Sequence, residues 1–409
     1  MGQQNLPHGT PELKIRKLRL SQKLREDTRP DTMNGPWQIL DVGSIWMREF
    51  ACAMAQETEV VAWWPVMRSM GALEHWERVE RHGSPELQVL RFPLQRGYAR
   101  PPLQQLFPYH QKLLRRLQTR CPGTASPLVC TTPFYAPVAE RWPGPVVYYV
   151  TDMTAEYVGL NRRQVVQLDR RMCQAATAVC PNSGRIRDYL LREAACSPAK
   201  LTVVPNATRQ ENIAAAPLLA PGERPKLIRH VERPIAGVIG NLSGNMDWLL
   251  LEDAIRQTPW LHWVMVGPTD MPIPDACQAE ARARIMRDPC VTFTGAKPYG
   301  ELQAYARCFN VAVLPYRKKE PTYSGSSTRF YEHLAACRPM VATRGFAELL
   351  EKPPLLELVD TPGEMVAAID QLRDTDFHDG HEAERWQASR HATWTDRARS
   401  LMHALEQRL

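Results

Sequence analysis

Short apolar runs alternate with amphipathic stretches along most of the chain. Each run has the length of a buried β-strand, and the intervening stretches repeat their apolar positions with a helical period. In the first half the apolar runs cover 37–41, 59–63, 87–91, 127–131, 145–150 and 201–206, and the helical patterns cover 47–55, 102–118 and 162–175. Buried strands separated by helices predict a parallel, doubly wound α/β sheet.

The same alternation starts again in the second half. Strands are predicted at 235–239, 261–266, 291–293, 311–314 and 340–343, and helices at 248–257, 276–287, 299–308 and 326–336. The pattern therefore predicts two α/β domains, at 36–210 and 234–375. The Ala- and Pro-rich stretch 211–233 is the expected linker, and the tail 376–409 is expected to be helical.

Length and composition agree with two cytoplasmic domains. The 409 residues are long enough for two cores, and 44% of them are hydrophobic. The ten cysteines are scattered without a Cys-x-x-Cys pair, which favours a reducing compartment over a disulfide framework or a zinc site. The first residues lack the apolar core of a signal peptide, and no apolar run reaches the length of a membrane span.

The positive charge is concentrated at the start of the chain. Residues 1–30 hold seven Lys or Arg against three acidic residues, out of a net charge of +7. This leader, 1–35, is either a solvated and partly disordered segment or a peripheral contact to the anionic inner face of a membrane. Nucleic acid is not expected as a partner, because no basic and aromatic repeat follows.

The segment from Ser324 to Thr343 carries the clearest chemistry. Ser326, Ser327 and Thr328 can cap a helix whose first turn contains Arg329, and Glu332 follows one turn later. Free N–H groups and a cation at a helix start favour a phosphate, and a carboxylate nearby suits a sugar diol. The alternative is an ordinary capped helix with a surface Arg–Glu pair.

This segment resembles the nucleotide-binding helix of GT-B glycosyltransferases. The resemblance implies that Arg329 contacts the diphosphate of a nucleotide sugar and that Glu332 holds its ribose. It covers residues 36 to 409 in order and implies two Rossmann-like domains facing across a cleft, with a C-terminal helix, from Trp386, crossing back onto the first domain. Cys337 replaces the small glycine of the family pattern, and Ser327-Thr328 replace Pro-Leu.

Two glycine-containing loops are expected on the donor side of the same cleft. Gly240 and Asn241 follow the strand 235–239, and Gly267 follows the strand 261–266. Glycine at a strand end lets a phosphate approach the backbone, although it can equally serve a tight turn. The resemblance places the Gly240 loop opposite the diphosphate.

The expected general base is Asp152, which follows the strand 145–150 and so faces the cleft. A base must reach the acceptor hydroxyl and be ionised near neutral pH. Its alternative role is to cap the following turn. The stretch Tyr148 to Gly159 resembles a bacterial subgroup that includes the glucuronosyltransferase of xanthan assembly, in which an Asp after this strand is the base of an inverting displacement. The first acid of the Glu-x7-Glu pattern of retaining relatives is replaced by Ser324.

The acceptor is expected on the first domain. Trp46, Arg48 and Trp64 lie at the ends of its first two predicted strands, where an aromatic ring could stack on a sugar; core packing is the alternative for each Trp. Asp374-Thr-Asp376, the one Asp-x-Asp, lies in a polar connection. No metal and no cofactor is therefore expected, and Arg329 with the helix start is expected to stabilise the leaving group.

Together these features predict a hexosyltransferase. The predicted reaction moves a sugar from a nucleotide diphosphate, with UDP favoured over GDP, to a hydroxyl of a saccharide or lipid-linked saccharide in surface polysaccharide or glycolipid synthesis. Two alternatives remain at this point: a nucleotide-sugar epimerase on the same fold, and a catalytically silent partner subunit.

Overall fold

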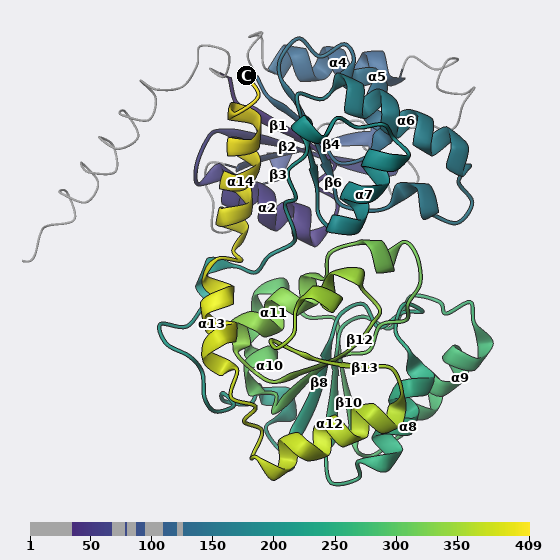
Figure 1. The fold of residues 1–409 in the computed structure, drawn as a ribbon, viewed down its shortest axis with the longest axis vertical. Coiled ribbons are helices and arrows are strands. Elements are labelled where there is room, and N and C mark those ends of the chain that lie inside the picture. Colours follow the sequence, from purple (N-terminus) through teal and green to yellow (C-terminus); the bar gives the residue numbers. More distant parts are fainter. Residues whose placement is uncertain (1–34, 68–77, 80–86, 95–108, 121–125) are drawn as a thin grey trace, which may run out of the picture.

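The structure has two α/β lobes joined by two adjacent chain crossings (Figure 1). It is a computed structural model that describes residues 35–67, 78–79, 87–94, 109–120 and 126–409. The predicted leader lies outside the described residues, apart from residue 35. Among the helices that the structure describes, none is both long and apolar enough to cross a bilayer.

The first sheet has the strand order β3-β4-β2-β1-β5-β6-β7, and all its neighbours are parallel except the pair β3 and β4. Its strands are β1 (Trp37–Leu40), β2 (Val60–Met67), β3 (Arg78–Val79), β4 (Leu87–Leu94), β5 (Leu128–Cys130), β6 (Val146–Val150) and β7 (Ala178–Pro181). The parallel strands follow the order of a doubly wound sheet, so β1 and β5 flank the point where the winding reverses. Ligands usually bind beyond the carboxyl ends of the strands at that point.

Helices cover both faces of this sheet. One face packs against α4 (Tyr109–Arg120), α5 (Ala136–Ala139), α6 (Arg162–Ala175) and α7 (Gly184–Arg192). The other face packs against α2 (Ile45–Ala55) and the last helix of the chain, α14 (Trp394–Glu406). Because both faces are covered, strands such as β6 are buried at every position.

The second sheet is fully parallel, with the order β10-β9-β8-β11-β12-β13. Its strands are β8 (Ile235–Ile239), β9 (His262–Val266), β10 (Val291–Gly295), β11 (Val311–Leu314), β12 (Met340–Thr343) and β13 (Glu357–Val359). Its helices are α8 (Trp248–Gln257), α9 (Ala276–Ile285) and α12 (Pro362–Asp374) on one face, and α10 (Leu302–Cys308) and α11 (Thr328–Ala336) on the other. Here the winding reverses between β8 and β11.

The chain crosses between the domains at two neighbouring places. Thr208 on the way out and Thr393 on the way back form a parallel bridge, with Thr208 N–H donating to the Ala392 carbonyl at 3.0 Å. The stretch expected as the interdomain linker, 211–233, packs on the second domain, where Ile228 and Val231 belong to the core. The crossing therefore precedes that stretch.

The C-terminal tail divides between the two domains. Helix α13 (Glu382–Arg390) stays on the second domain, where Arg385 Nε donates to the Cys337 carbonyl at 3.2 Å. Only α14 lies on the first domain, beside α2 (Figure 1). The return expected from Trp386 thus begins at Trp394, where Thr393 and Asp396 form a reciprocal capping box.

Candidate active site

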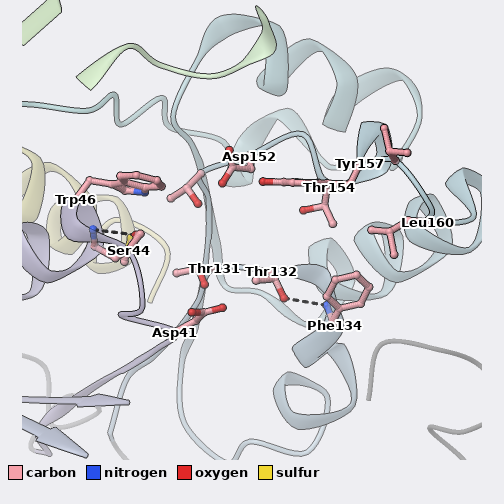
Figure 2. Close-up of a pocket in the computed structure, with 13 residues that line it drawn as sticks. Asp41, Ser44, Trp46, Thr131, Thr132, Phe134, Asp152, Thr154, Tyr157 and Leu160 are labelled. Atoms are coloured by element: carbon pink, nitrogen blue, oxygen red, sulfur yellow. Dashed lines mark hydrogen bonds between the residues drawn. The ribbon is translucent and has the colours of Figure 1, made fainter. Parts of the chain in front are cut away.

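A pocket of about 450 Å³ lies at the carboxyl ends of β1, β5 and β6. In Figure 2, Trp46 lies on one side of it and Phe134, Tyr157 and Leu160 on the other, with Asp41 and Asp152 between them. The described lining residues are two acids, six hydroxyl-bearing side chains and five others: Asp41 and Asp152; Ser44, Thr131, Thr132, Thr151, Thr154 and Tyr157; Trp46, Met47, Phe134, Val158 and Leu160. This position is the reversal point of the first sheet, and the volume suits a sugar.

Asp152 lies where the sequence predicts it, directly beyond β6 and lining the pocket. The turn that carries it is fixed from the next strand, because Asn182 Nδ2 donates to the Thr151 carbonyl at 2.6 Å. Burial raises the pKa of Asp152 to about 7, against an opposing effect of the Tyr157 hydroxyl, and the negative charge of Asp41 raises it further. A carboxylate with this pKa can accept a proton near neutral pH.

Asp41 is a second acid of the pocket, and the sequence reasoning missed it by including it in the first strand. The structure ends β1 at Leu40 and turns Asp41 out of the sheet with a φ of 69°. Asp tolerates this left-handed region better than most residues. Burial raises the pKa of Asp41, although the Gly43 N–H hydrogen bond opposes this. The sequence offered one signal, an acid at the end of the first apolar run, but the importance of that acid depends on the strand order.

Of the three residues predicted on the acceptor side, the described pocket lining includes one, Trp46. Trp46, in the first turn of α2, lines the pocket. Arg48 and Trp64 are not among its described lining residues; the Arg48 guanidinium lies 4.9 Å from the Trp64 ring centroid, and Arg91 lies 5.2 Å from it. Trp64 is therefore engaged by two cations, and its expected stacking on a sugar is not supported.

On the second domain, Gly240 and Gly267 lie at the carboxyl ends of β8 and β9. A Cβ on Gly267 would be 1.7 Å from the Gly240 carbonyl oxygen, so backbone packing by itself requires glycine here, and the expected approach of a ligand to Gly267 stays a prediction. A Cβ on Gly240 would instead lie 3.2 Å from the Tyr316 hydroxyl and 3.8 Å from Arg329 Nε. Asn241, next in the chain, is exposed.

Arg329 therefore lies beside the Gly240 turn, at the reversal point of the second sheet. Its Nη1 is buried, and no hydrogen-bond acceptor reaches it within the described part of the chain. An unpaired buried guanidinium nitrogen is costly unless a ligand satisfies it. Among the residues predicted to bind the nucleotide sugar, Arg329 is thus one with a buried polar atom that a ligand can satisfy.

The hydroxyls of Ser326, Ser327 and Thr328, at the start of α11, each make a hydrogen bond within the protein, and their expected contact with a nucleotide sugar stays a prediction. Ser326 Oγ accepts from the Asn206 backbone N–H at 3.0 Å, and the Asn206 side chain donates to Thr328 Oγ1 at 3.0 Å. Ser327 Oγ caps the helix at Phe330, as predicted for a cap. The Ser327 N–H donates to Glu348 Oε2 at 2.9 Å, so a protein carboxylate already takes that place at the helix start.

Glu332 is fully buried, whereas the ribose role requires an accessible carboxylate. Tyr299 donates its hydroxyl to one carboxylate oxygen, and Asn212 Nδ2 donates to the other at 3.2 Å. Burial raises the pKa of Glu332 to about 7, with Tyr299 and Arg329 opposing. In this conformation Tyr299 takes the place expected for the diol.

No group of three or more His, Cys, Asp or Glu that could hold a metal occurs among the described residues. Asp374 and Asp376 lie at the end of α12.

Comparison with known proteins finds a family match in the second domain. Residues 233–375 match the family model described as "Glycosyl transferases group 1". The second domain is thus similar to the group 1 glycosyl transferases, over a match that covers about a third of the chain. The matched segment contains Gly240, Gly267, Arg329 and Glu332, whereas Asp152 and its pocket lie outside the match.

Relatives of known structure share the whole fold at low sequence identity. Anabaena Alr3699/HepE, solved with UDP and glucose, has a TM-score of 0.68 and 16% identity, and the match covers 91% of this chain and 99% of that one. An α,α-trehalose-phosphate synthase (UDP-forming) from Burkholderia xenovorans, solved with glucose-6-phosphate, has a TM-score of 0.65 and 12% identity over 91% and 100%. Both likenesses concern the GT-B fold.

A sequence relative of the chain comes from Bacillus subtilis (strain 168). It is provisionally named the teichuronic acid biosynthesis glycosyltransferase TuaH. It is 22% identical over 277 residues, which are 67% of this chain and 64% of that protein.

Proposed function

We propose that the protein is a UDP-sugar-dependent glycosyltransferase. The observation that carries this is Arg329, whose buried Nη1 has no acceptor and which lies beside the Gly240 turn in a matched glycosyltransferase domain. The unpaired nitrogen can bind a diphosphate oxygen. UDP is the proposed nucleotide because the HepE structures hold UDP or UDP-glucose.

The acceptor hydroxyl is proposed to bind in the Asp152 pocket of the first domain. Asp152 Oδ takes the hydroxyl proton while the acceptor oxygen forms a bond to the anomeric carbon of the donor sugar. The bond from that carbon to the diphosphate oxygen breaks, and UDP leaves with the electron pair. Attack opposite the leaving group inverts the anomeric centre. Arg329 stabilises the charge on the leaving diphosphate, in place of a metal.

The proposed acceptor is a saccharide or lipid-linked saccharide of a surface polysaccharide or glycolipid. The name of the Bacillus relative, with its reference to teichuronic acid biosynthesis, supports polysaccharide assembly. The place of action, at the inner face of the membrane through the basic leader, stays a prediction.

Binding and turnover test this proposal in two steps. UDP and GDP are first compared for the rise in melting temperature, because a ligand that binds only the folded protein stabilises it. Arg329→Met keeps the length of the side chain but removes its charge, and should weaken UDP binding by about 10- to 100-fold, the effect of a lost charge-assisted hydrogen bond. Arg256→Met, on the exposed side of α8, is the matched control.

UDP-glucose is then incubated with the protein, with and without glycoside acceptors. Acceptor-dependent release of UDP supports a transferase, an epimerised donor would support an epimerase, and neither would support a silent subunit. Equal UDP affinity in wild type and Arg329→Met would contradict the proposed diphosphate site.

A further inference from the structure

The described lining of the acceptor pocket contains acidic side chains and no basic ones, which disfavours the binding of an anionic sugar. Of the thirteen described residues that line it, two are carboxylic acids and none is Lys, Arg or His. One cation near the pocket in the sequence, Arg162, has other partners, because it pairs with Glu156 at 2.9 Å and with Glu193 at 2.7 Å. An anionic group in the pocket would therefore meet two carboxylates. Neither the described lining residues nor Arg162 would supply a compensating cation.

The remaining lining suits an uncharged sugar. Six hydroxyl-bearing side chains can exchange hydrogen bonds with sugar hydroxyls, and Trp46 and Phe134 supply aromatic surface for the C–H faces of the ring. Carboxylates accept hydrogen bonds from hydroxyls, so Asp41 can orient the sugar while Asp152 faces the reacting hydroxyl. The left-handed backbone at Asp41, with a φ of 69°, is the kind of strain that functional sites retain.

We propose that the acceptor unit bound in this pocket is a neutral sugar, and that Asp41 excludes acceptors that carry a carboxylate or a phosphate. This inference rests on the proposed function and narrows its acceptor class. It separates the protein from its structural neighbour solved with glucose-6-phosphate, a charged sugar. It also means that anionic units of a growing saccharide lie outside the pocket.

The test measures binding of matched acceptor pairs to the protein saturated with UDP. Octyl glycosides of glucose, galactose, mannose and N-acetylglucosamine are compared with their C6-carboxylate or 6-phosphate counterparts by the shift in melting temperature and by titration calorimetry. At least one neutral glycoside should bind, at least about tenfold more tightly than its anionic counterpart, because two like charges a few ångströms apart repel strongly near a protein surface.

Variants assign the effect to Asp41. Asp41→Asn keeps the shape and tolerates the same backbone region, and should bring the two affinities of each pair to within about threefold. Thr154→Lys adds a cation to the pocket lining and should improve binding of the anionic members. Asp253→Asn, which removes an exposed charge from α8, should keep the wild-type ratio.

Each adverse outcome has a distinct meaning. Anionic acceptors that bind as well as neutral ones to the wild type, or no acceptor binding despite UDP binding, would overturn the proposal about the pocket. If Asp41→Asn left the ratio of neutral to anionic acceptor affinity unchanged, the proposed role of Asp41 in excluding anionic acceptors would be wrong. Failure of UDP itself to bind would instead overturn the proposed function.

Discussion

Replacement of the proposed base, Asp152→Asn, should stabilise the protein at alkaline pH while abolishing turnover. Burial raises the pKa of Asp152 from 3.8 to about 7, so the folded protein resists ionisation of this group. The stabilising contribution is complete below pH 3.8 and is lost as the pH rises through 7. Asn does not ionise, so it adds no pH-dependent loss of stability at this position.

The size of the effect follows from the pKa difference. One pKa unit corresponds to about 1.4 kcal/mol, so the full loss in the wild type is about 4 kcal/mol, of which about 3 kcal/mol falls between pH 5 and pH 8. The variant should gain that amount relative to the wild type over this interval. Asp169, whose pKa is raised to about 6 by burial, titrates in both proteins and cancels in the difference.

Urea denaturation of both proteins at pH 5, 6, 7 and 8 measures this difference. Asp253→Asn is the control, because it removes an exposed carboxylate. The reasoning would be refuted by parallel pH profiles for the wild type and Asp152→Asn, since a buried ionising carboxylate must make the two curves diverge. Retained UDP binding shows that the variant is folded.

Three further outcomes follow from the same contacts. The kcat/KM of the wild type should rise about tenfold per pH unit to about pH 7 and then level, because Asp152 must lose its proton to act; a flat profile from pH 5 to 8 would contradict this. Gly267→Ala should cost more than about 3 kcal/mol in urea denaturation, because its Cβ collides with the Gly240 carbonyl, whereas Gly363→Ala, with open space around it, should cost little. Tyr299→Phe should destabilise the protein by about 1–3 kcal/mol, and more at pH 8 than at pH 5, because the ionised Glu332 loses a donor; equal melting temperatures at pH 8 would argue against that hydrogen bond.

The fold could be predicted from sequence where strands are apolar throughout. The limits of β8, β11, β12, α6 and α8 agree with the predicted ranges. These elements are buried on both faces or carry a clear helical stripe, so a local pattern is sufficient. The short strand β7, Ala178–Pro181, was missed, and a strand was expected at 201–206, where only Leu201 makes a bridge.

Site residues could likewise be predicted where their position depends on the local sequence, but not where it depends on residues far away in the chain. Asp152 could be predicted, because its position depends only on the end of the preceding strand. Asp41 needed the strand order, since it becomes important only when β1 lies at the reversal point beside β5. The hydrogen bonds of the Ser326 and Thr328 hydroxyls could not be predicted, because their partner, Asn206, lies about 120 residues away in the chain.

A chain of contacts connects Glu332 on the second domain with helix α2 on the first domain. The Tyr299 hydroxyl donates a hydrogen bond to the Glu332 carboxylate, and the Tyr299 ring centroid lies 4.8 Å from the Arg209 guanidinium. Arg209 in turn pairs with Glu49 of α2 at 2.7 Å. A donor ribose that binds Glu332 must first displace the Tyr299 hydroxyl, since a fully buried carboxylate has no other open side. Because Glu49 lies one turn after Trp46, that displacement acts on the helix whose first turn lines the acceptor pocket. Donor binding by Glu332 would therefore require a rearrangement that the acceptor side of the cleft shares.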